Sequence, residues 1–437
     1  MIKLQEKVSD KSVKADSEQL HQIESDSGAQ ATPISAREKL LYIVLFMALV
    51  TIRIPNVLNG RFWAEEGTIF FRNAWQMPWY EALFVSYGGY LNITANGFSV
   101  LAAHLVPLEK ACYITSLCGL AVQTIPAVLL CLSQDKWLKN RTTLIAALLI
   151  VATLPLSQEV WLSTIGSQCH LNLCAALILV LAVRNDWVKH FNRIVLMLGP
   201  LSGPGAAFMV PLYFARAWFD RSKERLIQAL VLSAATAVQL LFFWRPQERS
   251  MGLEPVLLLS TWFVKHLVCP MFGFAESLEM TKLWRDKYLE GHVPSVPALI
   301  ASVALLGLFA FVAYRSKEKA PRWLFGSGLV LWILSSYGCL GDRTMLLIPG
   351  ANERYAFAPQ VLFELAILCL ATTSTGWTKT ICRSLVIWLI VIAAHEYFWS
   401  PGFYSAGPSW RSEVRHWRAD PTYVPKAWPI PGWEVHL

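Results

Sequence analysis

The chain has 437 residues and a formal net charge of +8, and 55% of its residues are hydrophobic while only 16% are charged. Soluble domains carry about a quarter charged residues, so this composition excludes a water-soluble enzyme and a disordered protein. The 9 cysteines are scattered without a C-x-x-C pair, which excludes a disulfide-stapled module. The class that fits is an all-α, polytopic helical membrane protein, because apolar segments in lipid must satisfy their backbone internally.

The N-terminal segment, residues 1–36, is polar and lacks aromatic residues, which is typical of a disordered cytoplasmic tail. The first apolar run, from Leu40 to Leu58, follows Arg37 and Lys39 and predicts an uncleaved anchor with a cytoplasmic N-terminus. Later apolar runs lie at 111–133, 142–157, 168–183, 226–244, 297–314, 323–340, 356–372 and 384–400. We therefore expect about nine full spans in a transmembrane domain over residues 37–400.

Clusters of Lys and Arg follow several of these runs and should stay in the cytoplasm. They lie at 136–141, 184–193, 216–225, 315–322 and 379–383. Cytoplasmic loops of this kind account for the positive net charge without nucleic-acid binding. The outer side then receives two large loops, 59–92 and 245–296, and a periplasmic C-terminal tail, 401–437.

Three apolar segments do not fit full spans under this orientation. Residues 93–107 precede a run that must enter the cytoplasm, so we expect a helix partly embedded from the outer side. Ile194–Phe214 lies between two basic clusters and contains a Gly- and Pro-rich middle, which predicts a hairpin of short helices dipping into the membrane. Val256–Phe272 should lie at the outer surface, with Lys265 and His266 on a polar side as anchors or as phosphate ligands.

The first outer loop contains two adjacent carboxylates, Glu65 and Glu66, flanked by aromatic residues. Neighbours on a helix point about 100° apart, so at most one of the two faces a given site. A carboxylate beside apolar surface can be tuned as a general base. The same two residues also fit acids in a solvated loop.

Polar residues at the ends of two other runs are candidates for substrate binding. Gln168, His170 and Asn172 enter an apolar run, and Gln168 and Asn172 share one helix face because they are four positions apart. They fit contacts to acceptor hydroxyls or hydrogen bonds between helices. Arg354 and Tyr355 precede the run 356–372, and Arg354 fits a lipid phosphate or an arginine that snorkels to headgroups. The sequence has no cluster of metal ligands, although a divalent cation could assist the chemistry.

The segment Trp63-Ala64-Glu65-Glu66-Gly67 resembles the W-A-E-D-G motif of a group of bacterial multi-spanning proteins, most of them uncharacterised. Glu66 stands where that motif has Asp. Further matching features are Gly89-Tyr90, Gly203-Pro204, Arg354-Tyr355 and Pro431-Gly432-Trp433, which spread over most of the chain. The layout is also similar to that of the C-type glycosyltransferases (GT-C), which include multi-spanning enzymes with an acidic residue in the first outer loop. Serotype-converting glucosyltransferases, which decorate O-antigen, have a similar size and architecture.

The resemblance implies a glycosyltransferase of the bacterial inner membrane. It would transfer a sugar such as glucose from a polyprenyl phosphate to a periplasmic glycan or lipid such as the O-antigen of lipopolysaccharide. Glu65 or Glu66 would take the proton of the acceptor hydroxyl, and Arg354 would stabilise the phosphate leaving group. The expected partners are this donor, the acceptor and membrane lipids. Two alternatives stay open: a transporter or flippase for a lipid-linked glycan, and a polymerase that lengthens glycan chains.

Overall fold

A computed structural model of the protein describes residues 33–54, 57–183, 185–243, 252, 254–339, 341–398, 407–429 and 431–437. These residues are mainly helical with very little strand, which confirms the all-α class. The one sheet among them is a hairpin of two-residue strands, β1 (Ser86–Tyr87) and β2 (Tyr90–Leu91), which pair antiparallel. The predicted disordered tail falls outside the described residues up to position 32, as do Arg184 and most of the 244–253 stretch.

Within the described residues, 6 helices are long and apolar enough to cross a membrane. They are Leu108–Leu132 (η3, Leu108–Lys110; α6, Ala111–Gln123; α7, Ile125–Leu132), α12 (Lys223–Phe243), Pro255–Phe272 (α13, Pro255–Trp262; η7, Phe263–Val268; α14, Cys269–Phe272), α16 (Val296–Arg315), α18 (Glu353–Thr373) and α19 (Gly376–His395). The expected nine full spans are therefore not confirmed. Two of the apolar runs form short helices, α8 (Arg141–Thr153) and α9 (Ser167–Val180), which at 1.5 Å per residue reach only about 20 Å of a ~30 Å hydrocarbon core.

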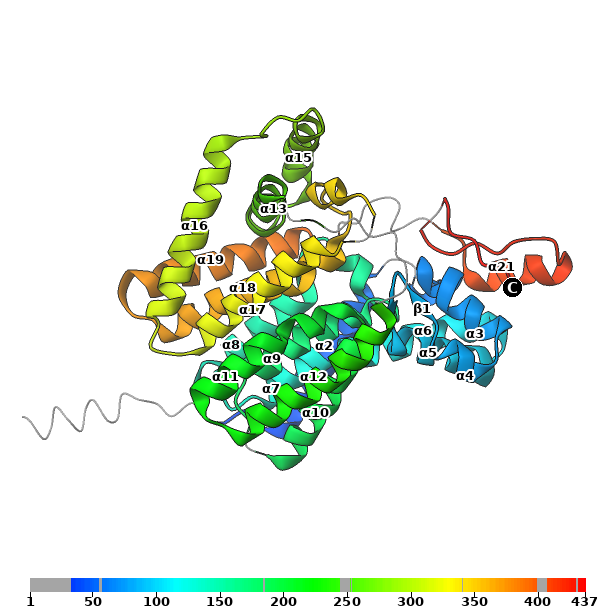
Figure 1. Ribbon diagram of the computed structural model, residues 1–437, viewed down its shortest axis with the longest axis horizontal. Coiled ribbons are helices and arrows are strands. Elements are labelled where there is room, and N and C mark those ends of the chain that lie inside the picture. The colour runs from blue at the N-terminus through cyan, green and yellow to red at the C-terminus, as the bar shows by residue number, and fades with distance from the viewer. Residues whose placement is uncertain are drawn as a thin grey trace, which may run out of the picture.

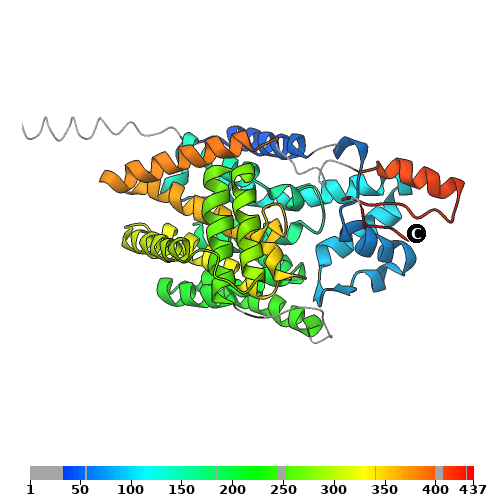
Figure 2. The same ribbon diagram turned by 90° about the horizontal axis from the view of Figure 1, so that it is seen from above.

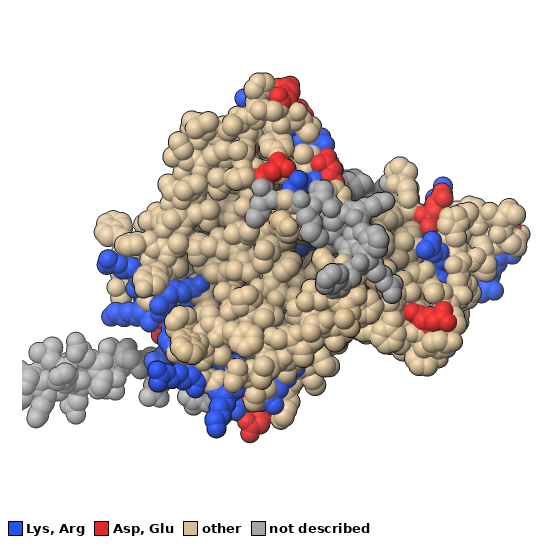
Figure 3. Space-filling model, in the orientation of Figure 1, with Lys and Arg blue, Asp and Glu red and all other residues tan. Residues whose placement is uncertain are grey.

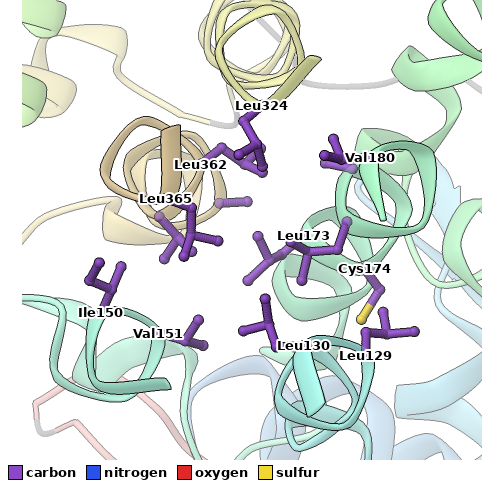
Figure 4. Close-up of a cluster of buried hydrophobic side chains, with 14 of the residues drawn as sticks. Leu129, Leu130, Ile150, Val151, Leu173, Cys174, Val180, Leu324, Leu362 and Leu365 are labelled. Carbon is purple, nitrogen blue, oxygen red and sulfur yellow. The ribbon is translucent and has the colours of Figure 1, made fainter. Parts of the chain in front are cut away.

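The core of the bundle surrounds α9 and α18. From Leu173 to Leu181 every residue of the α9 segment is buried, which is expected of a helix that is apolar on all sides. Helix α7 packs on one side of α9, and α17 (Ala320–Tyr337) and α18 pack on the other, while α8 packs against α7 and α18 (Figure 1). Figure 4 shows their side chains converging: Leu129, Leu130, Ile150, Val151, Leu173, Val180, Leu324, Leu362 and Leu365. This apolar contact holds the first residues of α9 and α18 close together.

The Gly- and Pro-rich segment forms the predicted break between two helices. Helix α10 (Asp186–Leu201) is followed by η6 (Pro204–Met209) and α11 (Val210–Asp220), and the chain bends by 117° between them. The tip of this bend packs on α9, where a Cβ at Gly205 would overlap the carboxamide of Asn172. Glycine lets the bend approach without displacing this carboxamide, and the bend reaches the N-terminal turns of α9.

The basic clusters meet at one end of the molecule. The contacts that join neighbouring connections are Ala182 to Asp135, Arg193 to Glu224 and Lys319 to Asp220. Arg383 donates to the Ala371 carbonyl across the turn between α18 and α19. Figure 3 shows Lys and Arg gathered around the end where α11 and the turn between α16 and α17 lie. A shared end is what a common cytoplasmic side requires; the side of the membrane that this end faces stays a prediction.

The opposite end carries a lobe made by residues 59–105, which include the predicted first outer loop, and by the C-terminal tail (Figure 1). It contains α3 (Arg72–Gln76), α4 (Trp79–Ala82), α5 (Ile93–Leu105) and α21 (Trp410–Ala419). Helix α5 matches the short helix expected at 93–107. Trp410 packs edge-on against Phe62 with ring centroids 4.7 Å apart, and its backbone N–H donates to the Gly60 carbonyl at 2.9 Å. The tail and the first outer loop therefore form one packed unit.

The segment from α13 to α14 lies across helices α17–α19, with α15 (Phe274–Leu289) beside it (Figures 1 and 2). Phe263 stacks on Trp284 of α15 at 5.0 Å, so the charged helix α15 covers this part of the segment. Lys265 and His266 were expected on a polar side, but the structure buries them, with exposures of 4% and 6%. Both face α18 instead, because η7 is a π-helical turn that changes the direction of its side chains.

Candidate functional site

The paired acids lie in a sharp turn of the first outer loop. Ala64 has a left-handed backbone with φ of 44°, and the π-helical segment η2 (Glu66–Phe71) begins two residues later. Glu66 is fully buried, and its carboxylate accepts hydrogen bonds from the backbone N–H groups of Trp63 at 3.2 Å and Thr164 at 2.6 Å. The Thr164 hydroxyl donates a further bond at 2.8 Å. Glu66 thus closes its own turn and ties this loop to the start of α9.

Both carboxylate oxygens of Glu66 are occupied by protein donors. Burial raises the pKa of Glu66, and the hydrogen bonds from Thr164 and Trp63 oppose that shift, as does the positive charge of Arg61. A carboxylate with no exposed oxygen cannot reach an acceptor hydroxyl. Of the two acids predicted as the base, Glu66 is therefore the one whose carboxylate is closed off by its own hydrogen bonds.

Glu65 points the other way and meets Arg354. Its side chain is 13% exposed, and its Oε1 lies 3.7 Å from Nη1 of Arg354 in the first turn of α18. Glu159, in η5 (Ser157–Val160), approaches the same guanidinium from another direction, with Oε1 3.7 Å from Nε. These distances are ion pairs rather than tight hydrogen bonds, and Nε has no hydrogen-bond acceptor among the described residues. The guanidinium thus lies between two carboxylates, and its Nε–H group has no hydrogen-bond acceptor in the described part of the chain.

Glu159 was not predicted as a site residue. Burial raises its pKa, the charge of Arg354 lowers it, and the nearby acids Glu353 and Glu65 raise it further. The signal in the sequence was a single charge in the otherwise uncharged connection between residues 154 and 166. An isolated carboxylate between two apolar runs is costly to bury and therefore marks a candidate site.

A cavity of about 210 Å³ lies beside Arg354. Four of the predicted binding residues line it together: Gln168 and Asn172 from α9, and Arg354 and Tyr355 from α18. The other lining residues are Tyr90 of β2, Pro204, Gly205 and Phe208 of η6, Cys169, Phe243 of α12, and Leu334, Ser335, Tyr337 and Gly338 at the end of α17. An apolar wall with a few convergent polar groups is typical of a small-molecule site.

Carboxamides supply much of the hydrogen-bonding capacity of this cavity. The Gln168 amide lies 3.5 Å from the Tyr90 hydroxyl, and Oδ1 of Asn172 has no partner among the described residues. Gly203 and Gly205 of the helix bend pack directly against these two amides. Glu65 and Glu159 are not lining residues, and they contact the cavity wall through Arg354.

The structure does not bring His170, which was predicted to bind substrate, to the cavity that Gln168 and Asn172 line. Its ring lies between Trp161 and Phe357, with centroid distances of 4.3 and 4.7 Å, and is fully buried. Its Nδ1–H donates to the Gly166 carbonyl at 3.0 Å. Two residues along a helix turn the side chain by about 200°, so His170 and Gln168 face opposite sides of α9.

Among the described residues, no three His, Cys, Asp or Glu side chains are grouped as they would be around a metal ion.

No family model, no curated protein and no solved structure matches this chain.

Proposed function

We propose that this protein is a glycosyltransferase of the bacterial inner membrane. It transfers a sugar from a polyprenyl phosphate to a hydroxyl group of a periplasmic glycan or lipid. The observation that carries this proposal is the ion pair between Glu65 and Arg354, 3.7 Å apart beside a cavity lined by carboxamide and aromatic side chains. A carboxylate and a cation side by side are the two groups that this reaction needs.

In the proposed reaction, the acceptor oxygen forms a bond to the anomeric carbon of the donor sugar. Glu65 takes the proton from the acceptor hydroxyl as this bond forms. The bond between the anomeric carbon and the phosphate oxygen breaks, and its electron pair leaves with the polyprenyl phosphate. The guanidinium of Arg354 stabilises the charge that develops on this phosphate. Glu65 then returns its proton to water, so the residues are restored after each turnover.

The cavity suits the sugar of such a donor. Gln168 and Asn172 can hydrogen-bond to sugar hydroxyls, and Oδ1 of Asn172, which meets no donor in the described part of the chain, can accept. The aromatic lining residues Phe208, Phe243 and Tyr337 offer apolar surface to the apolar face of a sugar ring. The phosphate then lies toward Arg354, and the acceptor approaches from the partly exposed side of Glu65.

Transfer from a labelled polyprenyl-phosphate glucose, with the purified protein in liposomes and O-antigen as acceptor, tests this function. We expect Glu65→Gln to lower kcat by about 100- to 10,000-fold, the range typical of a lost general base. Glu81→Gln is the matched control, because Glu81 is an exposed acid in the same outer loop. Full transfer activity in the Glu65→Gln protein at normal abundance would contradict the assignment of the base.

Transport of a lipid-linked glycan is the second candidate function. The bent pair of α10 with η6 and α11 favours it, because broken helices that border a cavity are common in transporters. Movement of a labelled lipid-linked glycan across the vesicle membrane without covalent change would favour transport. A polymerase would instead lengthen the acceptor glycan, which gel analysis of the product separates from addition of one sugar.

A further inference from the structure

Lys265 lies in the π-helical turn η7 with only 2% of its side chain exposed. Its ammonium group donates to the carbonyls of Ile348 at 2.8 Å and Ala351 at 3.0 Å, and to the carboxylate of Glu353. Three acceptors match the three donors that a lysine carries. Lys265 is therefore a fixed interior cation at the start of α18.

Helix α18 begins without a cap from its own N-cap side chain. Asn352 precedes it in the left-handed conformation, with φ of 55°, and its side chain makes no capping hydrogen bond. The carboxylate of Glu353 accepts from the Gly350 N–H at 2.6 Å as well as from Lys265. The backbone N–H of Glu353 donates to Oε2 of Glu159 at 3.2 Å. The turn over residues 348–353 is thus held by Lys265 on one side and Glu159 on the other.

Arg354 is the next residue along the chain and lines the cavity. Glu159 contacts both the backbone of Glu353 and the guanidinium of Arg354, the latter at 3.7 Å. Any movement of the turn therefore moves the cation at the cavity wall. A misplacement of about 1 Å is enough to weaken a catalytic contact strongly.

We propose that Lys265 is a positioning residue for Arg354. Through Glu353 and the turn 348–353, it sets where the guanidinium meets the phosphate of the polyprenyl-phosphate donor. This inference rests on the proposed function. Lys265 does not line the cavity beside Arg354, and the donors of its ammonium group are occupied. It therefore acts through Arg354 rather than on the substrate.

The test removes the whole ion pair, because removing Lys265 alone leaves a buried carboxylate without its partner and can prevent folding. The double variant Lys265→Met with Glu353→Gln keeps similar side-chain volumes and leaves no unpaired charge. The matched control is Lys282→Met with Glu279→Gln, which removes an exposed ion pair of 3.0 Å in α15. Lys265→Arg, which keeps the charge and changes its shape, is the third variant.

We expect the double variant to fold, with kcat for sugar transfer lowered at least tenfold and a smaller change in KM, because Arg354 acts on charge that develops in the transition state. Lys265→Arg should fall between it and the wild type, and the control pair should match the wild type. A wild-type kcat in the double variant would overturn the positioning role, since the pair would then be purely structural.

Hydrogen exchange gives a readout that does not depend on catalysis. In the double variant, peptides covering residues 350–355 should exchange faster than in the wild type, while peptides of α9 stay unchanged. If the wild-type protein transfers no sugar but these peptides still exchange faster in the double variant, the proposed function is wrong. Lys265 would then still be shown to stabilise the turn over residues 348–353. Unchanged exchange overturns the positioning role whatever the activity.

Discussion

Trp63 and Trp428 pair through their backbones, although they come from the first outer loop and the C-terminal tail. The Ala64 N–H donates to the Trp428 carbonyl, and the Trp428 N–H donates to the Phe62 carbonyl at 2.9 Å. The guanidinium of Arg61 lies 4.7 Å from the Trp63 ring and 5.1 Å from the Trp428 ring. The tail therefore holds the turn that aims Glu65 at Arg354.

Substitution Trp428→Ala should destabilise this turn. The side chain is 2% exposed, and loss of a buried tryptophan costs about 3–5 kcal/mol. We expect a lower unfolding temperature in detergent and lower transfer activity, because the turn that carries Glu65 loses the packing of the Trp428 side chain. Trp377→Ala, at a side chain that is 84% exposed in α19, is the control and should change neither. An unaltered unfolding temperature for Trp428→Ala would mean that the tail does not support the loop.

Glu66 should make stability depend on pH. Its pKa is raised in the folded protein by burial, so between its unfolded value near 4.5 and its folded value the folded state binds more protons than the unfolded state. The contribution to stability is therefore present below about pH 4.5 and is lost as the pH rises through the folded pKa.

The measurement is the unfolding temperature against pH for the wild type and for Glu66→Gln. We expect the wild type to lose stability relative to the variant as the pH rises above 4.5, because Gln cannot ionise. The variant should also be less stable at low pH by about 1–3 kcal/mol, since its amide opposes one of the N–H donors. A constant difference across the pH range would show that Glu66 has the same pKa in both states.

The sequence predicts which residues gather at the candidate site better than it predicts how each side chain is placed there. Glu65, Arg354, Gln168 and Asn172 could be named because polar residues at the ends of apolar runs are few and conspicuous. The burial of Glu66 could not be predicted, because it depends on Thr164, which lies far along the chain. A contact between residues far apart in the chain does not show in the residue pattern around either of them.

The nine predicted spans are not confirmed, because an apolar run in the sequence does not always form a helix of the same length. The run 142–157 predicts one span, but α8 ends at Thr153. Pro155 disfavours helix at the residue before it, and Leu156 adopts the left-handed conformation with φ of 61°. In contrast, the break at residues 202–203 was predicted correctly, because Gly and Pro act through local backbone geometry.

The helix bend should control the size of the cavity. In Gly205→Ala, the added methyl group overlaps the Asn172 carboxamide and pushes it toward the cavity. Overpacking of this kind costs about 1–3 kcal/mol, and we expect a higher KM for the sugar donor. Gly307→Ala in α16 is the control, because a methyl group there meets no atom within 4 Å. An unchanged KM for Gly205→Ala would indicate that the donor does not occupy this cavity.

The two faces of α9 should respond differently to substitution. Gln168→Ala and Asn172→Ala each remove one carboxamide from the cavity wall, and we expect KM for the donor to rise about tenfold, as for the loss of one hydrogen bond of about 1–1.5 kcal/mol. Their unfolding temperatures should stay close to the wild-type value, because neither side chain is fully buried.

His170→Ala removes a ring packed between Trp161 and Phe357, so its effect should be a loss of stability with KM unchanged in the folded fraction. Steady-state transfer kinetics paired with thermal unfolding of each variant separate the two classes. If His170→Ala raised KM as the two amide variants do while its unfolding temperature held, the substrate would lie on the other side of α9 from the cavity.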